Sequence, residues 1–249
     1  MAVDRPMTIV EHLEELRRRL LMAIVSLAAA TALCWFFADP LLSLLIRPVT
    51  ASSGRGVIFV GVTEAFFVRL KLALLAGVFL SLPVILYQVW AFVAVGLTPV
   101  ERRYALWLLP PALVLFVGGA LFALLAIVPV GVRFLLSYQV PGVLEPMISV
   151  GAYVSFLTAF MLAFGAVFEL PIVLIFLAKL GVITPAQLAG GRRYALVAIV
   201  VLAAVLTPGG DVFSQLLMAV PAYLLYEASV WIARLVAPSP AAMQQVEGR

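Results

Sequence analysis

The sequence predicts an all-α integral membrane protein, a kinked and concave bundle of six transmembrane helices with both chain ends in the cytoplasm. Hydrophobic residues make up 65% of the 249 residues and charged residues only 11%, whereas soluble domains are about half apolar and about a quarter charged. The hydrophobic residues also gather in runs of the length that crosses a bilayer. Because backbone polar groups find no water in hydrocarbon, these runs are expected to be helical.

Six apolar runs are the predicted spans of a single membrane domain. They cover residues 20–38, 70–94, 104–128, 152–178, 194–206 and 212–233. Residues 1–19 form a predicted cytoplasmic segment and residues 235–249 a predicted cytoplasmic tail. The fifth run is short, since its 13 residues rise only about 20 Å as a helix against a hydrocarbon core of about 30 Å. We therefore expect either local thinning of the bilayer or helix ends buried in protein.

The distribution of basic residues predicts the orientation of these spans. Of the 16 Lys and Arg residues, 11 fall on one side of the predicted spans and 5 on the other. The richer side is expected to be cytoplasmic. An even number of crossings then places both termini in the cytoplasm.

Loops and prolines shape the predicted bundle. The two outer loops, 39–67 and 129–151, hold apolar residues between prolines and are expected to form short amphipathic helices at the membrane surface. Pro83, Pro171 and Pro221 lie inside the second, fourth and sixth runs, where proline bends a helix. Three bends in helices that run in the same direction predict a concave wall.

Cysteine and histidine counts limit the possible chemistry. Cys34 is the only cysteine and His12 the only histidine in the sequence, which excludes an internal disulfide and a metal site built on these residue types. No cofactor is predicted. The basic residues are scattered around apolar runs, which is typical of membrane topology and does not indicate binding of nucleic acid.

Four stretches of the chain resemble the TatC family in order and spacing. They are 12–20 (HLEELRRRL), 82–92 (LPVILYQVWAF) followed by Glu101-Arg102-Arg103, 163–171 (AFGAVFELP), and 206–208 (LTP) followed by 211–215 (DVFSQ). Gly209-Gly210 departs from the family, which commonly has a proline before the aspartate. The resemblance implies a bacterial inner-membrane receptor for folded proteins whose signal peptides carry paired arginines. It also implies two single-helix partners, TatA and usually TatB, transport driven by the proton-motive force, and no enzymatic activity.

Glu15 and Glu101 match the two family carboxylates that receive the paired arginines. A guanidinium is planar and permanently charged, and it pairs with a carboxylate through two parallel hydrogen bonds that lysine cannot reproduce. Each residue also has an ordinary interpretation. Glu15 has the helical spacing for an ion pair with Arg18 or Arg19, and Glu101 is otherwise a solvated loop charge.

Arg17 and Phe92 are further candidates for signal-peptide binding by the same resemblance. Arg17 either shapes the cytoplasmic pocket or anchors the first helix at the interface. Phe92 ends the second run and is either part of the pocket or packed against lipid or protein.

Glu169 is the acid that the sequence places deepest in an apolar run. Acids at such depth are costly and usually face protein or a watery cavity, so we expect a functional role. The alternative is a protonated acid that is hydrogen-bonded to a neighbouring helix. Glu227 is nearer the cytoplasmic end, where reaching to the interface is the expected behaviour.

Thr207, Asp211 and Gln215 flank the turn between the fifth and sixth runs. By resemblance, this hairpin is where TatA or TatB helices dock, and a Gln215 side chain within the membrane suits an interhelical hydrogen bond. Asp211 is alternatively the N-cap of the sixth helix.

Two other protein classes compete with the receptor. A secondary transporter or channel needs polar residues along a path through the membrane, and Glu169 is nearly alone there. An intramembrane protease needs a catalytic pair inside the bundle, and the single histidine lies outside it. By the family resemblance, the expected partners are TatA, TatB, twin-arginine signal peptides, membrane lipid and other copies of this chain.

Overall fold

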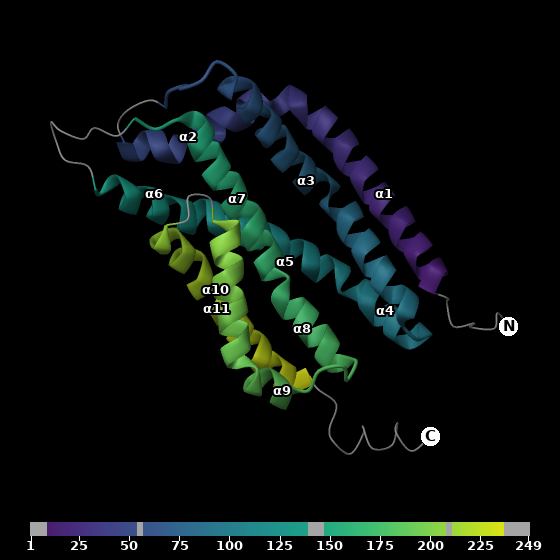
Figure 1. The fold of residues 1–249 in the computed structure, drawn as a ribbon. Coiled ribbons are helices and arrows are strands. Elements are labelled where there is room, and N and C mark those ends of the chain that lie inside the picture. The colour runs from purple at the N-terminus through teal and green to yellow at the C-terminus, as the bar shows by residue number, and fades with distance from the viewer. Residues whose placement is uncertain (1–8, 54–56, 139–146, 208–210, 237–249) are drawn as a thin grey trace, which may run out of the picture.

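The computed structural model describes residues 9–53, 57–138, 147–207 and 211–236. Nearly all of these residues are helical (Figure 1). One isolated parallel β-bridge, between Ile58 and Ser149, joins the two long connections. Residues 237–249 of the predicted cytoplasmic tail (235–249), and residues 208–210 between the fifth and sixth predicted runs, lie outside the described residues.

The helices follow the predicted apolar runs but are subdivided. Their bounds are α1 (Ile9–Cys34), η1 (Trp35–Phe37), α2 (Ala38–Ser53), α3 (Glu64–Val93), η2 (Ala94–Gly96), α4 (Pro99–Trp107), α5 (Leu109–Phe122), the π-helical turn η3 (Ala123–Ile127), α6 (Val128–Leu136), α7 (Val150–Phe168), α8 (Leu170–Lys179), α9 (Pro185–Gly190), α10 (Arg192–Leu206) and α11 (Val212–Val236).

Five helical segments of the described chain are long and apolar enough to cross a membrane. They are Val10–Arg47, Glu64–Gly96, Glu101–Leu136, Val150–Lys179 and Val212–Leu235. The predicted class, an all-helical membrane protein, is confirmed. The fifth predicted run corresponds to α10, whose 15 residues fall short of that length, so the sixth crossing stays a prediction.

The ends of the predicted spans differ from the observed helices. The first helix begins at Ile9, inside the segment predicted as a cytoplasmic extension, because the charged stretch before the first span is itself helical. The predicted short helices of the outer loops are confirmed as α2 and α6. The helix that leads into the third predicted run, 104–128, begins earlier than that run, at Pro99 of α4.

Pro171 interrupts the fourth predicted span. α7 ends at Phe168, and α8 begins at Leu170 with Pro171 in its first turn. Proline has no amide hydrogen and its ring disfavours helical continuity through the preceding turn. The helix is therefore interrupted where a bend was predicted, whereas α3 and α11 continue through Pro83 and Pro221 as single helices.

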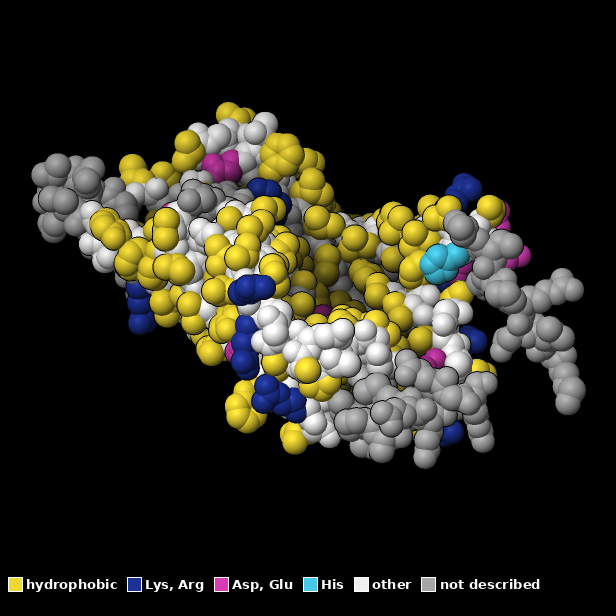
Figure 2. Space-filling model, turned by 60° about the horizontal axis from the view of Figure 1, so that its bottom comes forward, with side chains coloured by type: hydrophobic (Ala, Val, Ile, Leu, Met, Phe, Trp, Pro, Cys, Tyr) yellow, Lys and Arg dark blue, Asp and Glu magenta, His cyan; other side chains and the backbone are white. Residues whose placement is uncertain are grey.

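The helices pack around α7, which contacts α3, α5 and α11. Leu157, Phe160 and Phe164 of α7 are completely buried. α1 lies along α3 on the outside of this group (Figure 1). On the face shown in Figure 2 the surface is hollowed, and hydrophobic side chains line most of the hollow.

Candidate functional site

The candidate site lies where several helix ends meet. The start of α1, the end of α3, α4 and the end of α8 gather at one end of the molecule (Figure 1). The Trp90 and Phe176 rings, from α3 and α8, lie 5.0 Å apart. The Lys179 ammonium of α8 lies 3.8 Å from the centre of the Tyr104 ring of α4. These contacts fix α4 and α8 beside the end of α3.

Glu15 lies on α1 in an ion pair with its own helix. The Arg19 guanidinium donates to the Glu15 carboxylate at 2.6 Å, and also to the Gln88 side-chain oxygen of α3 at 3.1 Å. The Glu15 and Arg19 side chains are only 20% and 21% exposed. The intrahelical pair that the sequence allowed is therefore formed, and it joins Glu15 to α3 through Gln88.

His12 and Phe92 form a second contact between α1 and α3. Their rings stack with centroids 4.7 Å apart and an interplanar angle of 29°. Phe92 is half-buried. The ring that it packs against, His12, belongs to the same chain. No role was predicted for His12, which lies one turn before Glu15 on the same helix.

Glu101 belongs to the first turn of α4. Its carboxylate accepts from the Thr98 amide at 2.9 Å, while its own amide donates to the Thr98 hydroxyl. This reciprocal pair is a capping box, which satisfies two free amides at a helix start. The interpretation of Glu101 as a solvated loop charge is therefore wrong. The Thr-x-x-Glu spacing that signals the capping box was present in the sequence.

Two surface hollows accompany these acids. One, of about 430 Å³, is lined by five residues of α1, namely Glu14, Arg17, Arg18, Leu21 and Met22. The other, of about 640 Å³, is lined by Pro99, Arg103, Tyr104 and Trp107 of α4. Arg17 is thus exposed beside Glu15. Within the described chain, no hydrogen bond or ion pair links Arg17 or Glu101 to the Glu15–Arg19–Gln88 network.

Glu169 lies at the break between α7 and α8. It is the last residue before α8 and is half-buried. Its Oε1 atom is buried and has no hydrogen-bond partner among the described residues. The expected alternative, a carboxyl group hydrogen-bonded to a neighbouring helix, is not formed by this atom. An unsatisfied acid oxygen in an apolar span is typical of a functional position.

The hairpin of α10 and α11 holds the three remaining candidates. The Asp211 carboxylate accepts from the Ser214 amide at 2.7 Å, which confirms its N-cap role. The buried Thr207 hydroxyl donates to the Ala203 carbonyl. The side-chain amide of Gln215 donates to the Val200 carbonyl at 3.0 Å, and this hydrogen bond links α11 to α10.

Glu227 forms an ion pair, and the expectation that it reaches to the interface stays a prediction. Arg192, at the start of α10, donates to both Glu227 oxygens at 2.7 and 2.9 Å. Tyr223 donates to the same carboxylate at 3.0 Å. This pair fixes the start of α10 to the end of α11.

The described residues contain no group of three or more His, Cys, Asp or Glu side chains that could hold a metal ion. Glu15 and Glu101 lie apart, one tied to a guanidinium and the other to a backbone amide. Of the two, Glu15 is the one seen to bind a cationic group.

Known proteins resemble this chain over most of its length. The family model described as "Sec-independent protein translocase protein (TatC)" matches residues 11–221. A relative of that description from Carboxydothermus hydrogenoformans is 43% identical over 235 residues, which is 94% of this chain and 96% of the relative. One from Aquifex aeolicus is 39% identical over 231 residues, 92% of this chain and 95% of the relative. A crystal structure of the twin-arginine translocase receptor TatC superimposes on this structure with a TM-score of 0.82 at 39% sequence identity. The match covers 90% of this chain and 99% of the chain in that crystal structure.

Proposed function

The chain belongs to the TatC family, the receptor component of the twin-arginine translocase, and from this membership we propose that it binds the twin-arginine signal peptides of folded precursors. It is a transport component and not an enzyme. The binding surface is the end of the molecule formed by the start of α1, the end of α3 and α4. Glu15 and Glu101 receive the two arginines there.

One observation carries this proposal. Glu15 already binds a guanidinium, that of Arg19, at 2.6 Å in a partly buried setting. The site therefore has the geometry that a guanidinium needs. A carboxylate that is mostly withdrawn from water pairs more strongly with an arginine than an exposed one does.

Apolar contact supplies the rest of the affinity. An exposed ion pair contributes only about 0–1 kcal/mol, so two such pairs cannot hold a peptide firmly. Phe92 and the hollow lined by Pro99, Tyr104 and Trp107 lie beside the acids. The apolar part of the signal peptide packs there and along the hydrophobic hollow of the bundle (Figure 2). Glu169 lies within the membrane at the bend of this bundle and serves a polar function during transport.

The hairpin of α10 and α11 is the proposed docking surface for TatA and TatB helices. Among the described residues of α10, only Ile199 and Ala203 are buried. Val197, Leu202 and Val205 are more than half exposed. A single helix packed on this face would bury them, close to Thr207, Asp211 and Gln215. The assembly with these partners and further copies of the chain then uses the proton-motive force for export.

The proposed topology has six crossings with both termini in the cytoplasm. α10 is the short crossing. The end that carries Glu15 and Glu101 also carries the basic residues of the richer side, including Arg17, Lys179 and Arg192. The positive-inside rule places this end in the cytoplasm, where a folded precursor arrives.

Peptide binding tests the function directly. The full chain in lipid nanodiscs is titrated with a fluorescent twin-arginine signal peptide and with its twin-lysine counterpart. The receptor assignment predicts saturable binding of the arginine peptide, weaker binding of the lysine peptide, and loss of binding in both Glu15→Lys and Glu101→Lys. Equal affinity for the two peptides, or unchanged binding by both variants, contradicts the assignment.

A further inference from the structure

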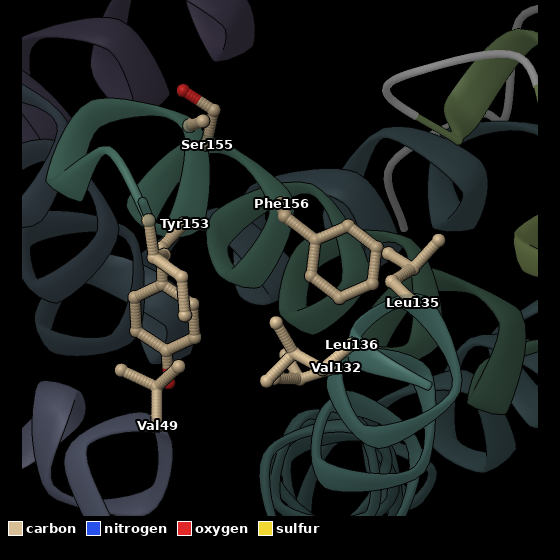
Figure 3. A pocket seen from close by; sticks show the side chains of 9 residues that line it. Val49, Val132, Leu135, Leu136, Tyr153, Ser155 and Phe156 are labelled. Carbon is tan, nitrogen blue, oxygen red and sulfur yellow. The ribbon is translucent and has the colours of Figure 1, made fainter. Parts of the chain in front are cut away.

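A pocket of about 390 Å³ lies between α2, α6 and α7, at the end of the molecule away from α4. Its volume falls in the range of sites that enclose small ligands. Figure 3 shows side chains from these three helices around an open centre. The residues that contribute apolar groups to the pocket wall are Val49, Val132, Leu135, Leu136, Tyr153 and Phe156.

The polar groups at this pocket are already occupied. The Tyr153 hydroxyl donates to the Leu45 carbonyl at 2.8 Å. The Ser155 hydroxyl donates to the Gly151 carbonyl and accepts from the Lys71 ammonium, both at 2.6 Å. Figure 3 shows Ser155 at the rim, with its oxygen directed away from Phe156. The interior therefore suits a hydrocarbon chain and offers little to a polar ligand.

Lys71 places a positive charge at the rim. It is an exposed residue of the span that begins at Glu64, where an unpaired cation is costly. Ser155, its hydrogen-bond partner, lines both the pocket and an adjoining hollow of about 350 Å³ that Lys71 and Glu64 also line.

Glu64 does not neutralise this charge by a direct pair. Its carboxylate accepts from four donors, namely the amides of Val60, Gly61 and Gly151 and the hydroxyl of Ser149. Among the described residues Lys71 forms no ion pair. The ammonium is therefore available to an anion that approaches from the membrane.

We propose that this pocket binds one anionic phospholipid. One acyl chain fills the space between α2, α6 and α7, and the phosphate accepts from the Lys71 ammonium. The pocket belongs to a protein with membrane-spanning helices. An anionic lipid joins a long apolar chain to a negatively charged headgroup, which matches an apolar cavity with a cation at its rim. A docked partner helix would also cover apolar walls, but it would give no reason for the cation at the rim. The bound lipid would fasten α6 and α2 to α7.

The test uses the full chain, purified and delipidated in a neutral detergent. Native mass spectrometry measures retention of dioleoyl phosphatidylglycerol against dioleoyl phosphatidylcholine. The wild type should retain the anionic lipid about fivefold better, the ratio expected for one lysine near an anionic lipid surface. Lys71→Gln should abolish this preference. Arg69→Gln, which removes a cation paired with Asp39 at 2.8 Å on the same helix, should leave it unchanged.

A second variant tests the pocket separately from the charge. Ala152 is exposed and lines both the pocket and the adjoining hollow, so Ala152→Phe should fill the entrance and lower retention of both lipids. Equal retention of the two lipids by the wild type overturns the proposal, as does an unchanged preference in Lys71→Gln. If Ala152→Phe retains both lipids as the wild type does, the lipid binds to the surface charge alone, and the proposed pocket is overturned. Binding of a twin-arginine peptide by each variant reports its fold independently.

Discussion

Arg19 lies across Glu15, one helical turn away on α1, and its guanidinium donates to the carboxylate at 2.6 Å while also reaching Gln88 of α3 at 3.1 Å. The carboxylate that we propose for a signal-peptide arginine is thus already paired with an arginine of its own chain. An incoming guanidinium has to exchange with Arg19. This exchange weakens binding but favours a ligand that, like Arg19, donates to Glu15 and Gln88 at the same time.

Removing the competing arginine should therefore strengthen binding. Arg19→Gln is expected to raise the affinity for a twin-arginine peptide about two- to fivefold, the equivalent of about 0.5–1 kcal/mol for a surface ion pair. Fluorescence anisotropy in nanodiscs measures the change. Arg18→Gln, which removes an exposed neighbouring charge, is the matched control. Weaker binding by Arg19→Gln would mean that Arg19 itself contacts the peptide.

Charge and helix capping can be separated at Glu101. Glu101→Gln keeps the capping box, because glutamine at this position also accepts from the Thr98 amide, but it removes the carboxylate charge. Peptide affinity should fall at least about tenfold, since hydrogen bonds to charged groups are the strong ones, while amide exchange of α4 stays as in the wild type.

Thr98→Ala should give the converse result. It removes the cap at a cost of about 1 kcal/mol and should speed hydrogen exchange at the start of α4, with a smaller loss of affinity than Glu101→Gln. Hydrogen-exchange mass spectrometry and peptide titration of both variants check this prediction. Unchanged affinity in Glu101→Gln beside a clear loss in Thr98→Ala would show that Glu101 acts only by capping.

Glu64 joins two connections that are far apart in the sequence. Its carboxylate accepts from the Val60 amide at 2.6 Å and the Gly151 amide at 2.6 Å, and also from Ser149. Glu64→Ala should release both connections, lower the Tm and speed exchange of the Gly151 amide. Glu64→Gln, which can still accept at one oxygen, should have a smaller effect. Asp39→Asn is the control, since it alters only an exposed ion pair with Arg69.

Local signals account for the parts of the molecule that the sequence could predict. Long apolar runs predicted the membrane class, the proline at 171 predicted the break beside Glu169, and Asp211 has the residue type and position of an N-cap. Each of these features depends on residues close together in the sequence. The capping box of Thr98 and Glu101 is equally local, since its Thr-x-x-Glu spacing can be read from the sequence.

The remaining features depend on residues far apart in the chain. Arg19 meets Gln88 across 69 positions, and Glu227 meets Arg192 across 35. A single sequence gives the charges of these residues but not their partners, because the partners are set by how the helices pack. For the same reason, the stacking of His12 on Phe92 and the four donors around Glu64 could not be predicted.

α10 offers a test of membrane thinning. Its 15 residues rise about 22 Å, less than the hydrocarbon core of about 30 Å, so the bilayer beside it should be thinned if it crosses. Inserting one apolar turn after Val201 should relieve this mismatch and slow export of a twin-arginine reporter, with peptide binding unchanged. As the control, the same apolar turn of about four residues is inserted after Val236, outside α10. Normal export by the lengthened helix would remove the thinning hypothesis.

Gly77 sets the distance between α1 and α3. A Cβ atom added at this position would lie 2.9 Å from the Thr31 backbone, a contact that only a shift of one helix can relieve. Gly77→Ala should therefore cost about 1–3 kcal/mol of stability, the usual effect of overpacking, and lower the Tm. Gly118→Ala, where nothing lies within 4 Å, should not.

The same shift should reach the binding site. Gln88 contacts Arg19, and Phe92 stacks on His12, only while α1 stays in register along α3. Gly77→Ala should thus weaken twin-arginine peptide binding even below the Tm, where the protein is folded, whereas Gly118→Ala should bind as the wild type does. A variant with a lowered Tm and full affinity at low temperature would show that the peptide does not depend on the alignment of α1 with α3. Glu15 would then act from α1 alone.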